Sequence, residues 1–241
     1  MELKHSVALI TGASKGLGLE IARLYAERGA PLVIAARHPG PLELAAEELR
    51  HETEVVSLAV DVSQDAEQLV EAGLERFGRI DVLVNNASEL GPSPMPDLES
   101  LDWQDMERIL RVNVTAPLHL AQLVLPQMRA QRNGVIINVT SDAGVKAYAG
   151  WGGYGASKAA LEHLSRVLAQ ELAGSGIRVY VVDPGDMNTE MHRLAEPGVD
   201  LSHLPGPDIS APAFVRLVEE ETAAFGRFQA QEMAATPAGR G

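Results

Sequence analysis

Cysteine is absent from the 241 residues of this chain. Its absence excludes disulfide bonds, thiol nucleophiles and cysteine-ligated metal sites. The seven histidines are scattered and include no His-x-x-x-His pair, so the sequence carries no spacing that is typical of a metal site. We therefore predict a protein that binds no metal.

Basic residues are also scarce, with 20 lysines and arginines against 33 aspartates and glutamates, and the formal net charge is -13. This balance argues against nucleic acid or an anionic membrane as a partner, although a local cationic spot can still bind a phosphate group. No apolar run is long enough to cross a membrane, and the one near the N-terminus is too short for a signal peptide. We therefore expect a cytoplasmic protein.

Short apolar runs alternate with longer amphipathic ones along most of the chain. Strands are predicted at 7–11, 31–36, 54–60, 81–86, 134–141 and 177–183, and helices at 18–29, 40–51, 66–78, 102–131 and 154–172. The strand segments are apolar throughout, which is typical of parallel strands buried on both faces. The pattern predicts an α/β fold: one doubly wound, Rossmann-like domain, whose mostly parallel sheet of six to seven strands carries helices on both faces.

The sequence shows no internal domain boundary, and we predict a single domain over residues 1–233. A stretch rich in proline and glycine, 196–212, separates the sixth predicted strand from a short predicted helix at 211–225. We expect residues 186–225 to form a lid on the substrate side. Residues 226–233 are the candidate for a seventh strand, and residues 234–241 are predicted to be a disordered tail.

The octapeptide TGASKGLG, residues 11–18, follows the first predicted strand and opens the first helix. Ligands of doubly wound folds bind outside the carboxyl ends of the strands. Gly12, Gly16 and Gly18 would permit a tight turn and let a pyrophosphate approach the backbone N–H groups at the helix N-terminus. The alternative is a turn that needs glycine for its backbone alone, since the spacing differs from Gly-x-Gly-x-x-Gly.

The end of the second predicted strand carries a cation where many NAD-binding proteins carry an acid. A carboxylate there accepts the 2′-hydroxyl of the NAD ribose, but no acidic residue lies between Glu27 and Glu43. Arg37 stands at this strand end, and Lys15 stands at a helix N-terminus, where the helix dipole disfavours a cation. Two cations without an acid suit the 2′-phosphate of NADP, and the alternative is a pair of solvated surface charges.

The other strand ends also carry polar residues or glycine: Asp61-Val62, Asn85-Asn86-Ala87-Ser88, Ser141 and Asp183-Pro184-Gly185. Each of them alone could be turn chemistry. Asn113 is different because it lies in an otherwise apolar helical stretch, where a buried amide needs partners. The alternative for Asn113 is a core asparagine that the backbone satisfies. Together the six strand ends indicate one site at this edge of the sheet.

Tyr154 and Lys158 stand one helical turn apart, and so on the same face of the predicted helix. A tyrosine has a pKa of about 10, and a nearby ammonium group lowers that pKa because it favours the phenolate. Such a pair can transfer a proton at working pH. The alternative is a half-buried tyrosine beside a surface lysine.

In order and spacing, these motifs resemble those of the short-chain dehydrogenase/reductase family over about residues 6–190. The resemblance rests on Thr11–Gly18, Asn85-Asn86-Ala87, Asn113, Ser141, Tyr154-x-x-x-Lys158 and Pro184-Gly185-x-x-x-Thr189. It implies hydride transfer between a nicotinamide cofactor and a small-molecule carbonyl or alcohol, on a seven-stranded sheet, in a homodimer or homotetramer. A dinucleotide-binding sensor or scaffold without turnover is the alternative, although such relatives typically lose the tyrosine or the lysine.

The resemblance also implies a role for each matching residue. Tyr154 would exchange the proton, and Lys158 would tune it and bind the nicotinamide ribose. Ser141 would hydrogen-bond the substrate oxygen, and Asn113 would hold a water that links Lys158 to solvent. Thr189 would hold the carboxamide of the nicotinamide. NADP(H) is the expected cofactor, with NAD(H) as the alternative, and its expected contacts are Gly12, Ser14, Lys15, Gly16, Leu17, Gly18, Arg37, Asp61, Val62, Asn85, Ala87, Tyr154, Lys158, Pro184, Gly185 and Thr189.

Three features depart from the family pattern. Ser88 replaces the usual glycine after Asn-Asn-Ala, Asp142 places an acid directly after Ser141, and the segment 226–233 lacks the usual glycine-rich turn. Asp142 could bind a polar substrate group or cap a turn. An apolar part of the substrate is expected to contact a pocket wall made of Leu90, Val145, Tyr148, Trp151, Met187 and Met191.

Overall fold

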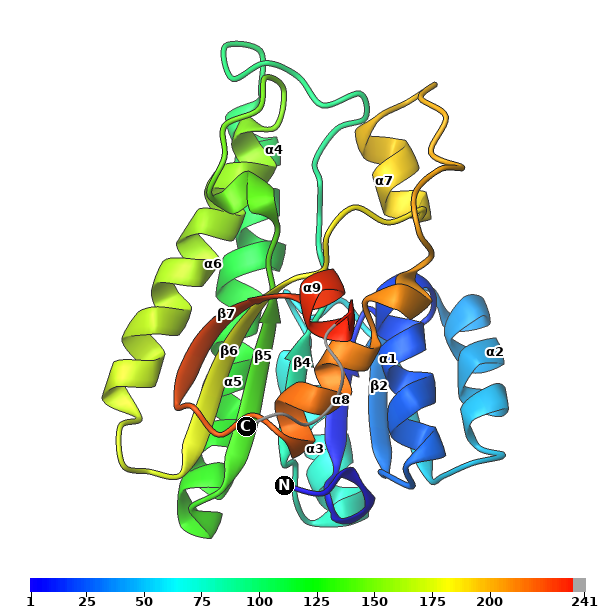
Figure 1. Cartoon of the computed structure of the whole chain (residues 1–241), viewed down its shortest axis with the longest axis vertical. Coiled ribbons are helices and arrows are strands. Elements are labelled where there is room, and N and C mark those ends of the chain that lie inside the picture. Colours follow the sequence, from blue (N-terminus) through cyan, green and yellow to red (C-terminus); the bar gives the residue numbers. More distant parts are fainter. Residues whose placement is uncertain (236–241) are drawn as a thin grey trace.

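Seven parallel strands form one sheet in the computed structural model, which describes residues 1–235 (Figure 1). The strand order is β3-β2-β1-β4-β5-β6-β7, and each neighbouring pair is parallel. The strands are β1 (Ala8–Thr11), β2 (Leu32–Ala36), β3 (Val55–Ala59), β4 (Val82–Asn85), β5 (Gly134–Val139), β6 (Ile177–Asp183) and β7 (Phe225–Gln229). The predicted doubly wound α/β fold is therefore confirmed.

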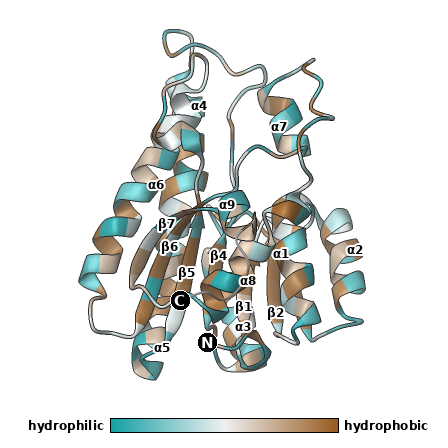
Figure 2. Cartoon of the chain, in the orientation of Figure 1, coloured by the Kyte–Doolittle hydropathy of each residue, from teal (hydrophilic) through white to brown (hydrophobic). Residues whose placement is uncertain are grey.

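Successive side chains of the inner strands enter two separate cores, which explains why those strand segments are apolar throughout. In β1, Ala8 and Ile10 belong to one core and Leu9 belongs to the other. The first core is closed by α1 (Gly16–Glu27), α2 (Pro39–Leu49) and α8 (Pro212–Glu219). The second is closed by α3 (Ala66–Phe77), α5 (Ala116–Gln131) and the end of α6 (Gly152–Glu171). Figure 2 shows the hydrophobic strands between helices whose outward sides are largely hydrophilic.

The helix predicted over 102–131 is divided. It consists of α4 (Trp103–Leu110), a π-helical segment η2 (Arg111–Thr115) and α5. Pro117 supplies the physical reason, because it has no N–H to donate to the carbonyl of residue 113 and its ring clashes with that carbonyl in a regular α-helix. The sequence periodicity continues across the junction, so a single helix was the wrong prediction here.

The C-terminal region also differs from the predicted boundaries. The helix predicted at 211–225 ends earlier, at Glu219, and its last predicted residue, Phe225, is instead the first residue of β7. The candidate strand 226–233 is a strand only to Gln229, and α9 (Ala230–Ala235) follows it. Residues 234 and 235 of the predicted tail belong to α9, and the rest of the tail lies outside the described residues. Within residues 1–235, no helix combines the length and the apolar character needed to span a bilayer.

Two segments rise beyond the carboxyl edge of the sheet, the connection from β4 to α4 and the region around α7 (Glu190–Ala195) (Figure 1). The second belongs to the predicted lid, 186–225. Residues 186–207 of that region contribute many side chains to a cavity, whereas α8 packs its apolar side against the sheet. The short helical turns η1 (Leu3–His5), η3 (Asp142–Gly144) and η4 (Pro207–Ile209) complete the described chain.

Candidate active site

A cavity of about 1530 Å³ runs along the carboxyl edge of the sheet. All seven strands of the sheet end at it, and residues at or just after each strand end line it: Gly12, Arg37, Asp61, Ala87, Ser141, Pro184 and Gln229. Pockets for drug-sized ligands measure roughly 300–1,000 Å³. The volume therefore has room for a dinucleotide together with a small substrate.

The loop between β1 and α1, together with the first turn of α1, has three positions that require glycine, and we call it the glycine cradle. Gly12 has a φ of +68° and Gly16 a φ of +57°, which is the left-handed region that side chains disfavour. A Cβ on Gly18 would lie 2.4 Å from the carbonyl oxygen of Gly12, so Gly18 allows α1 to pack closely on this loop. Lys15 is the N-cap and its side chain makes no cap bond, so the first-turn N–H groups stay available to an anion. The residues present therefore fit a pyrophosphate.

The two cations predicted for a 2′-phosphate both border the cavity, and both already have carboxylate partners. Lys15 Nζ lies 2.6 Å from Glu190 Oε2, and Arg37 Nη1 lies 3.2 Å from Glu89 Oε2. Both cationic side chains are more than half exposed, so these pairs are weak. Both carboxylate partners come from segments far from residues 27–43, so the local sequence around Arg37 does not indicate them.

Tyr154 and Lys158 are buried together near the start of α6. Tyr154 is 9% exposed and Lys158 is 2% exposed, and both line the cavity. The Lys158 Nζ atom lies 5.3 Å from the centroid of the Tyr154 ring and donates a hydrogen bond of 2.9 Å to the Val139 carbonyl oxygen. Lys158 is therefore not a surface lysine, which removes the simpler alternative for this pair.

Burial dominates the ionisation of both groups. It lowers the pKa of Lys158 to about 7, and it raises the pKa of Tyr154 above its ordinary value. Hydrogen bonding to Ser88 and Ser141 works to lower the pKa of Tyr154. The Lys158 charge was expected to lower the pKa of Tyr154, but it is not among the main causes of the pKa shift of Tyr154 in this structure. Burial desolvates both side chains and leaves Lys158 only partly charged near neutral pH.

Asn113 lies behind the cavity rather than in its lining, and every hydrogen-bonding position of its amide is used. Its Oδ1 accepts from the Glu89 N–H at 2.7 Å and from the Ser88 hydroxyl at 3.1 Å. Its Nδ2 donates to the Glu89 carbonyl oxygen at 2.8 Å and to Ser157 Oγ at 2.9 Å. The amide therefore fixes the segment after β4 to α6, the helix that carries Tyr154.

Asn85 and Asn86 point in different directions at the end of β4. Asn85 is buried away from the cavity and donates to Asn138 Oδ1 at 2.8 Å. Asn86 borders the cavity and donates to the carbonyl oxygens of Thr11 and Gly12, at 2.9 and 3.2 Å. No sequence pattern distinguishes Asn86 from Asn85, because either asparagine could face the site from this strand end.

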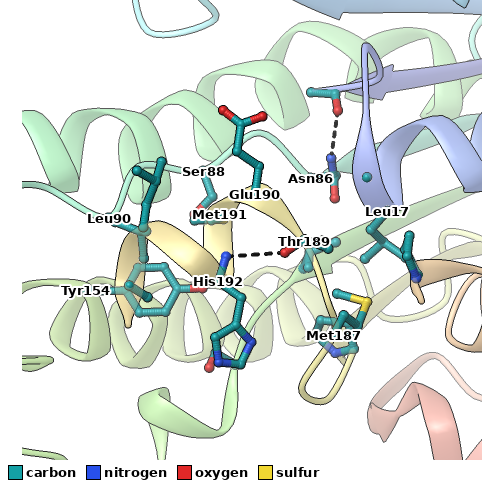
Figure 3. A pocket seen from close by; sticks show the side chains of 18 of the residues that line it. Leu17, Asn86, Ser88, Leu90, Tyr154, Met187, Thr189, Glu190, Met191 and His192 are labelled. Carbon is teal, nitrogen blue, oxygen red and sulfur yellow. Dashed lines mark hydrogen bonds between the residues drawn. The ribbon is translucent and has the colours of Figure 1, made fainter. Parts of the chain in front are cut away.

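The predicted substrate wall forms with one exception. Leu90, Tyr148, Trp151, Met187 and Met191 line the cavity, whereas Val145 is 67% exposed and does not. The rings of Tyr148, Trp151 and Tyr154 follow one another with centroid distances of 6.1 and 5.9 Å. In Figure 3, Tyr154 and Leu90 occupy one side of the view, and Leu17 and Met187 lie toward the other. The three rings thus form an aromatic wall of the cavity, which ends at the candidate catalytic residue Tyr154.

Asp142 supports this wall. The Tyr148 hydroxyl donates to Asp142 Oδ2 at 2.5 Å, and Lys146 Nζ lies 3.4 Å from the same oxygen. Burial works to raise the pKa of Asp142, but the hydrogen bonds from Tyr148 and Lys146 outweigh it and hold the pKa below its usual range. Asp142 also lines the cavity, so its predicted role in binding a polar substrate group stays a prediction, whereas the turn after β5 is capped by Ser141.

The C-terminal segment contributes residues that the sequence did not indicate. Gln229, Gln231 and Glu232 line the cavity, and Gln231 Nε2 donates to the Asp186 carbonyl oxygen at 3.0 Å. Gly185 has a φ of +75°, a backbone conformation that residues with a side chain rarely adopt, and it lies next to the side-chain amide of Gln231. The helix α9, which carries Gln231, lies in the segment that departs from the family pattern.

A model of the short chain dehydrogenase family matches residues 6–199. This chain belongs to that family. An uncharacterized oxidoreductase of Listeria monocytogenes is 38% identical over 196 residues, which cover 79% of this chain and 78% of that protein. A short-chain dehydrogenase from Pseudomonas syringae has a TM-score of 0.87 at 30% identity, over 95% of this chain and 96% of that one. A metagenomic short-chain oxidoreductase in complex with NADP has a TM-score of 0.80 at 30% identity, and the match covers 95% of this chain and 99% of that one.

In this short-chain dehydrogenase, most of the predicted site residues gather around the one cavity. Those that line it are Gly12, Ser14, Lys15, Gly16, Leu17, Arg37, Asp61, Val62, Ala87, Ser141, Tyr154, Lys158, Pro184, Gly185 and Thr189. Gly18, Asn85 and Asn113 lie outside the lining. The Thr189 hydroxyl accepts from the His192 N–H at 3.3 Å and caps α7 (Figure 3). Among residues 1–235, no group of three or more histidine, aspartate or glutamate side chains is placed to hold a metal ion.

Proposed function

We propose that this short-chain dehydrogenase transfers a hydride between NADP(H) and a carbonyl or secondary alcohol. The observation that carries the proposal is the burial of Tyr154 and Lys158 in one cavity with Ser141, beside the glycine cradle at the start of α1. The NADP complex of the metagenomic relative supports the choice of cofactor. The first turn of α1 would hold the pyrophosphate, and Lys15 and Arg37 would contact the 2′-phosphate.

In carbonyl reduction, the nicotinamide supplies the hydride when it is bound, and Tyr154 supplies the proton. The Tyr154 O–H bond breaks as its proton passes to the carbonyl oxygen, which becomes the alcohol hydroxyl. The Ser141 hydroxyl stabilises the charge that develops on that oxygen. Lys158, with a pKa of about 7, can be charged or neutral near neutral pH, and its charged form favours the phenolate. Alcohol oxidation runs through the same residues in reverse.

A screen for NADPH consumption tests the proposal most simply. Ketones, aldehydes, sugars and thioesters would be offered at one cofactor concentration, and the aromatic wall beside Tyr154 favours substrates with an apolar portion. We expect oxidation of NADPH with at least one carbonyl class. NADPH binding without turnover of any class would instead favour a sensor or scaffold.

The cofactor preference should depend on the end of β2. The wild type is expected to use NADPH better than NADH, because Lys15 and Arg37 would both contact the 2′-phosphate. Both cations are exposed and already paired with a carboxylate, which weakens these contacts and limits the expected preference to a factor on the order of ten to several hundred. Replacing Ala36 by Asp and Arg37 by Ala should reverse the preference, since the new acid accepts the ribose hydroxyl and repels the phosphate. The measurement is kcat/KM for both cofactors at one stated salt concentration.

The matched control for this change is Arg50→Ala. It removes an exposed arginine of the same half of the chain whose partner, Glu43, does not line the cavity. The cofactor preference of this control should equal that of the wild type. Equal or better use of NADH by the wild type would show that Lys15 and Arg37 are surface charges only.

We also propose a homodimer or homotetramer that forms through the α4–α5 region and α6. Exposed apolar side chains on two of these helices, Trp103 and Val167, support this surface. Sedimentation at micromolar protein concentration is expected to give the mass of a dimer or tetramer. A monomer under those conditions would contradict the assignment.

A further inference from the structure

A buried ion cluster lies just outside the cavity lining, between the edge strand β7 and α6. The Glu162 side chain of α6 is 3% exposed, and Arg227 of β7 directs its Nε–H to both oxygens of this carboxylate, at 3.1 and 3.2 Å. Neither residue lines the cavity. A buried carboxylate needs cationic or hydrogen-bonding partners, but the roles proposed above for the site use neither Glu162 nor Arg227.

Glu162 binds the end of β5 to α6. The Thr140 hydroxyl donates to Glu162 Oε1 at 2.9 Å, and both side chains are buried. Thr140 directly follows Val139, whose carbonyl oxygen accepts from Lys158 Nζ at 2.9 Å, and it directly precedes Ser141. Because Lys158 and Glu162 stand one turn apart, α6 holds this segment at two consecutive turns. The position of Ser141 relative to α6 therefore depends on the Glu162 contact.

Arg227 extends the cluster to the end of β6. Its Nη2 atom lies 3.6 Å from Asp183 Oδ2, and Asp183 Oδ1 accepts from the Gly185 N–H at 3.0 Å. Asp183 is buried and borders the cavity together with Pro184 and Gly185. Burial has the largest effect on the pKa of Asp183 and raises it, whereas the Gly185 N–H and the Arg227 charge act in the opposite direction. One arginine is thus shared by two buried carboxylates that come from different elements.

We propose that Arg227 is a positioning residue, which holds the ends of β5 and β6 in place against α6 through Glu162 and Asp183. The inference rests on the proposed function, in which Ser141 contacts the substrate oxygen and Gly185 contacts the cofactor. A guanidinium suits this task because its N–H groups form a rigid, planar fork that can face two carboxylates at once. Without it, two buried carboxylates lose a cationic partner, and the segments that they hold are expected to shift toward water.

Arg227→Gln tests the proposal, because it removes the charge and keeps much of the side-chain length. We expect kcat for a carbonyl that the wild type reduces to fall about ten- to hundredfold, since a misplacement of about 1 Å can cost that much. Calorimetric binding of adenosine 2′,5′-bisphosphate should be unchanged, because this fragment would reach only the glycine cradle and the end of β2. Arg227→Lys keeps the charge without the fork, so its kcat should be intermediate. It carries the same measurements if the glutamine variant does not fold.

Arg166→Gln is the matched control. Arg166 also contacts Glu162, with its Nη2 atom 3.3 Å from Oε2, but this contact lies within α6 and the arginine side chain is more than half exposed. We expect Arg166→Gln to keep the wild-type kcat. If Arg227→Gln also keeps it, or if the two variants lose kcat equally, the bridge to Asp183 has no positioning role and the proposal is overturned. A parallel loss of kcat and fragment binding in Arg227→Gln would show general support of the fold and would overturn it as well.

Hydrogen exchange read by mass spectrometry gives a second measurement that needs no turnover. Peptides that cover residues 139–145 and 183–189 should exchange faster in Arg227→Gln than in the wild type, whereas peptides of the glycine cradle, residues 11–18, should keep the wild-type rate. Wild-type exchange in both of the first two segments would contradict the proposal. Failure to find any carbonyl substrate would contradict the proposed function alone, and hydrogen exchange would then still decide whether Arg227 holds the two segments.

Discussion

Replacing Tyr154 by phenylalanine is expected to lower kcat by a factor of about 10²–10⁴ or more, because a positioned proton donor contributes that much to a reaction of this kind. The dissociation constant of NADPH should change little, since the hydroxyl serves the substrate oxygen. The ring that packs at 5.9 Å from Trp151 is kept, so the fold should be preserved. Stopped-flow kinetics and a fluorescence titration of NADPH measure the two quantities.

Tyr148→Phe is the matched control for this variant. It removes a second tyrosine hydroxyl from the same aromatic wall, but that hydroxyl donates to Asp142 and is partly exposed. We expect Tyr148→Phe to keep most of kcat. A Tyr154→Phe enzyme that also keeps most of its kcat would show that another group supplies the proton.

Replacing Lys158 by alanine is expected to reduce both kcat and NADPH affinity, in contrast to the Tyr154 change. Lys158 is fully buried with its Nζ atom 5.3 Å from the centroid of the Tyr154 ring, and in the proposed function its ammonium would contact the cofactor ribose and favour the phenolate. A lysine that only decorated a helix surface would change stability by a few tenths of a kcal/mol at most. Near-normal kcat/KM in Lys158→Ala would contradict the proposal that Lys158 acts together with Tyr154 in catalysis.

The same lysine makes the stability of the protein depend on pH. The pKa of Lys158 is about 7 in the folded chain and about 10.4 in an unfolded one. Between these values the unfolded chain binds more protons, so the free energy of unfolding rises with pH, and the full cost of the buried charge is felt below about pH 7. Lys158→Met removes this cost and keeps the bulk of the side chain.

Thermal unfolding of the protein without added cofactor measures the effect. Lys158→Met should have a higher Tm than the wild type at pH 7 and below, by about 2–4 °C for each kcal/mol recovered. The difference should shrink as the pH approaches 10. Lys146→Met, at an exposed lysine, should show no such gain at low pH. A Lys158→Met curve that parallels the wild type at every pH would mean that Lys158 is hydrated and charged in the folded protein.

Local patterns predicted the sheet because the strand segments are apolar on both faces, and the two cores of the structure require that. The glycine-rich turn after β1 could also be predicted from the local sequence, because Gly12 and Gly16 have positive φ angles that favour glycine. The break at η2 was missed because apolar periodicity continues across it, and a proline alone does not mark it: Pro117 follows the break, whereas Pro126 lies inside the continuous α5.

Contacts between distant segments account for the remaining differences at the site. Glu89 is 52 residues from Arg37, and Glu190 is 175 residues from Lys15, so no local reading of the chain brings these pairs together. The pKa directions of Tyr154 and Lys158 could not be predicted either, because they depend on burial that only the packed structure defines. Side-chain direction at a strand end, which separates Asn85 from Asn86, is set by the same packing.

Transfer of deuterium tests the central claim most directly. NADPH labelled with deuterium at its transferable nicotinamide position would be incubated with the wild-type protein and a carbonyl compound that the screen identifies. The proposed function predicts one deuterium on the carbinol carbon of the product for each NADPH consumed, and none with Tyr154→Phe on the same timescale. Product without deuterium, or NADPH consumption without an alcohol product, would contradict direct hydride transfer at this site.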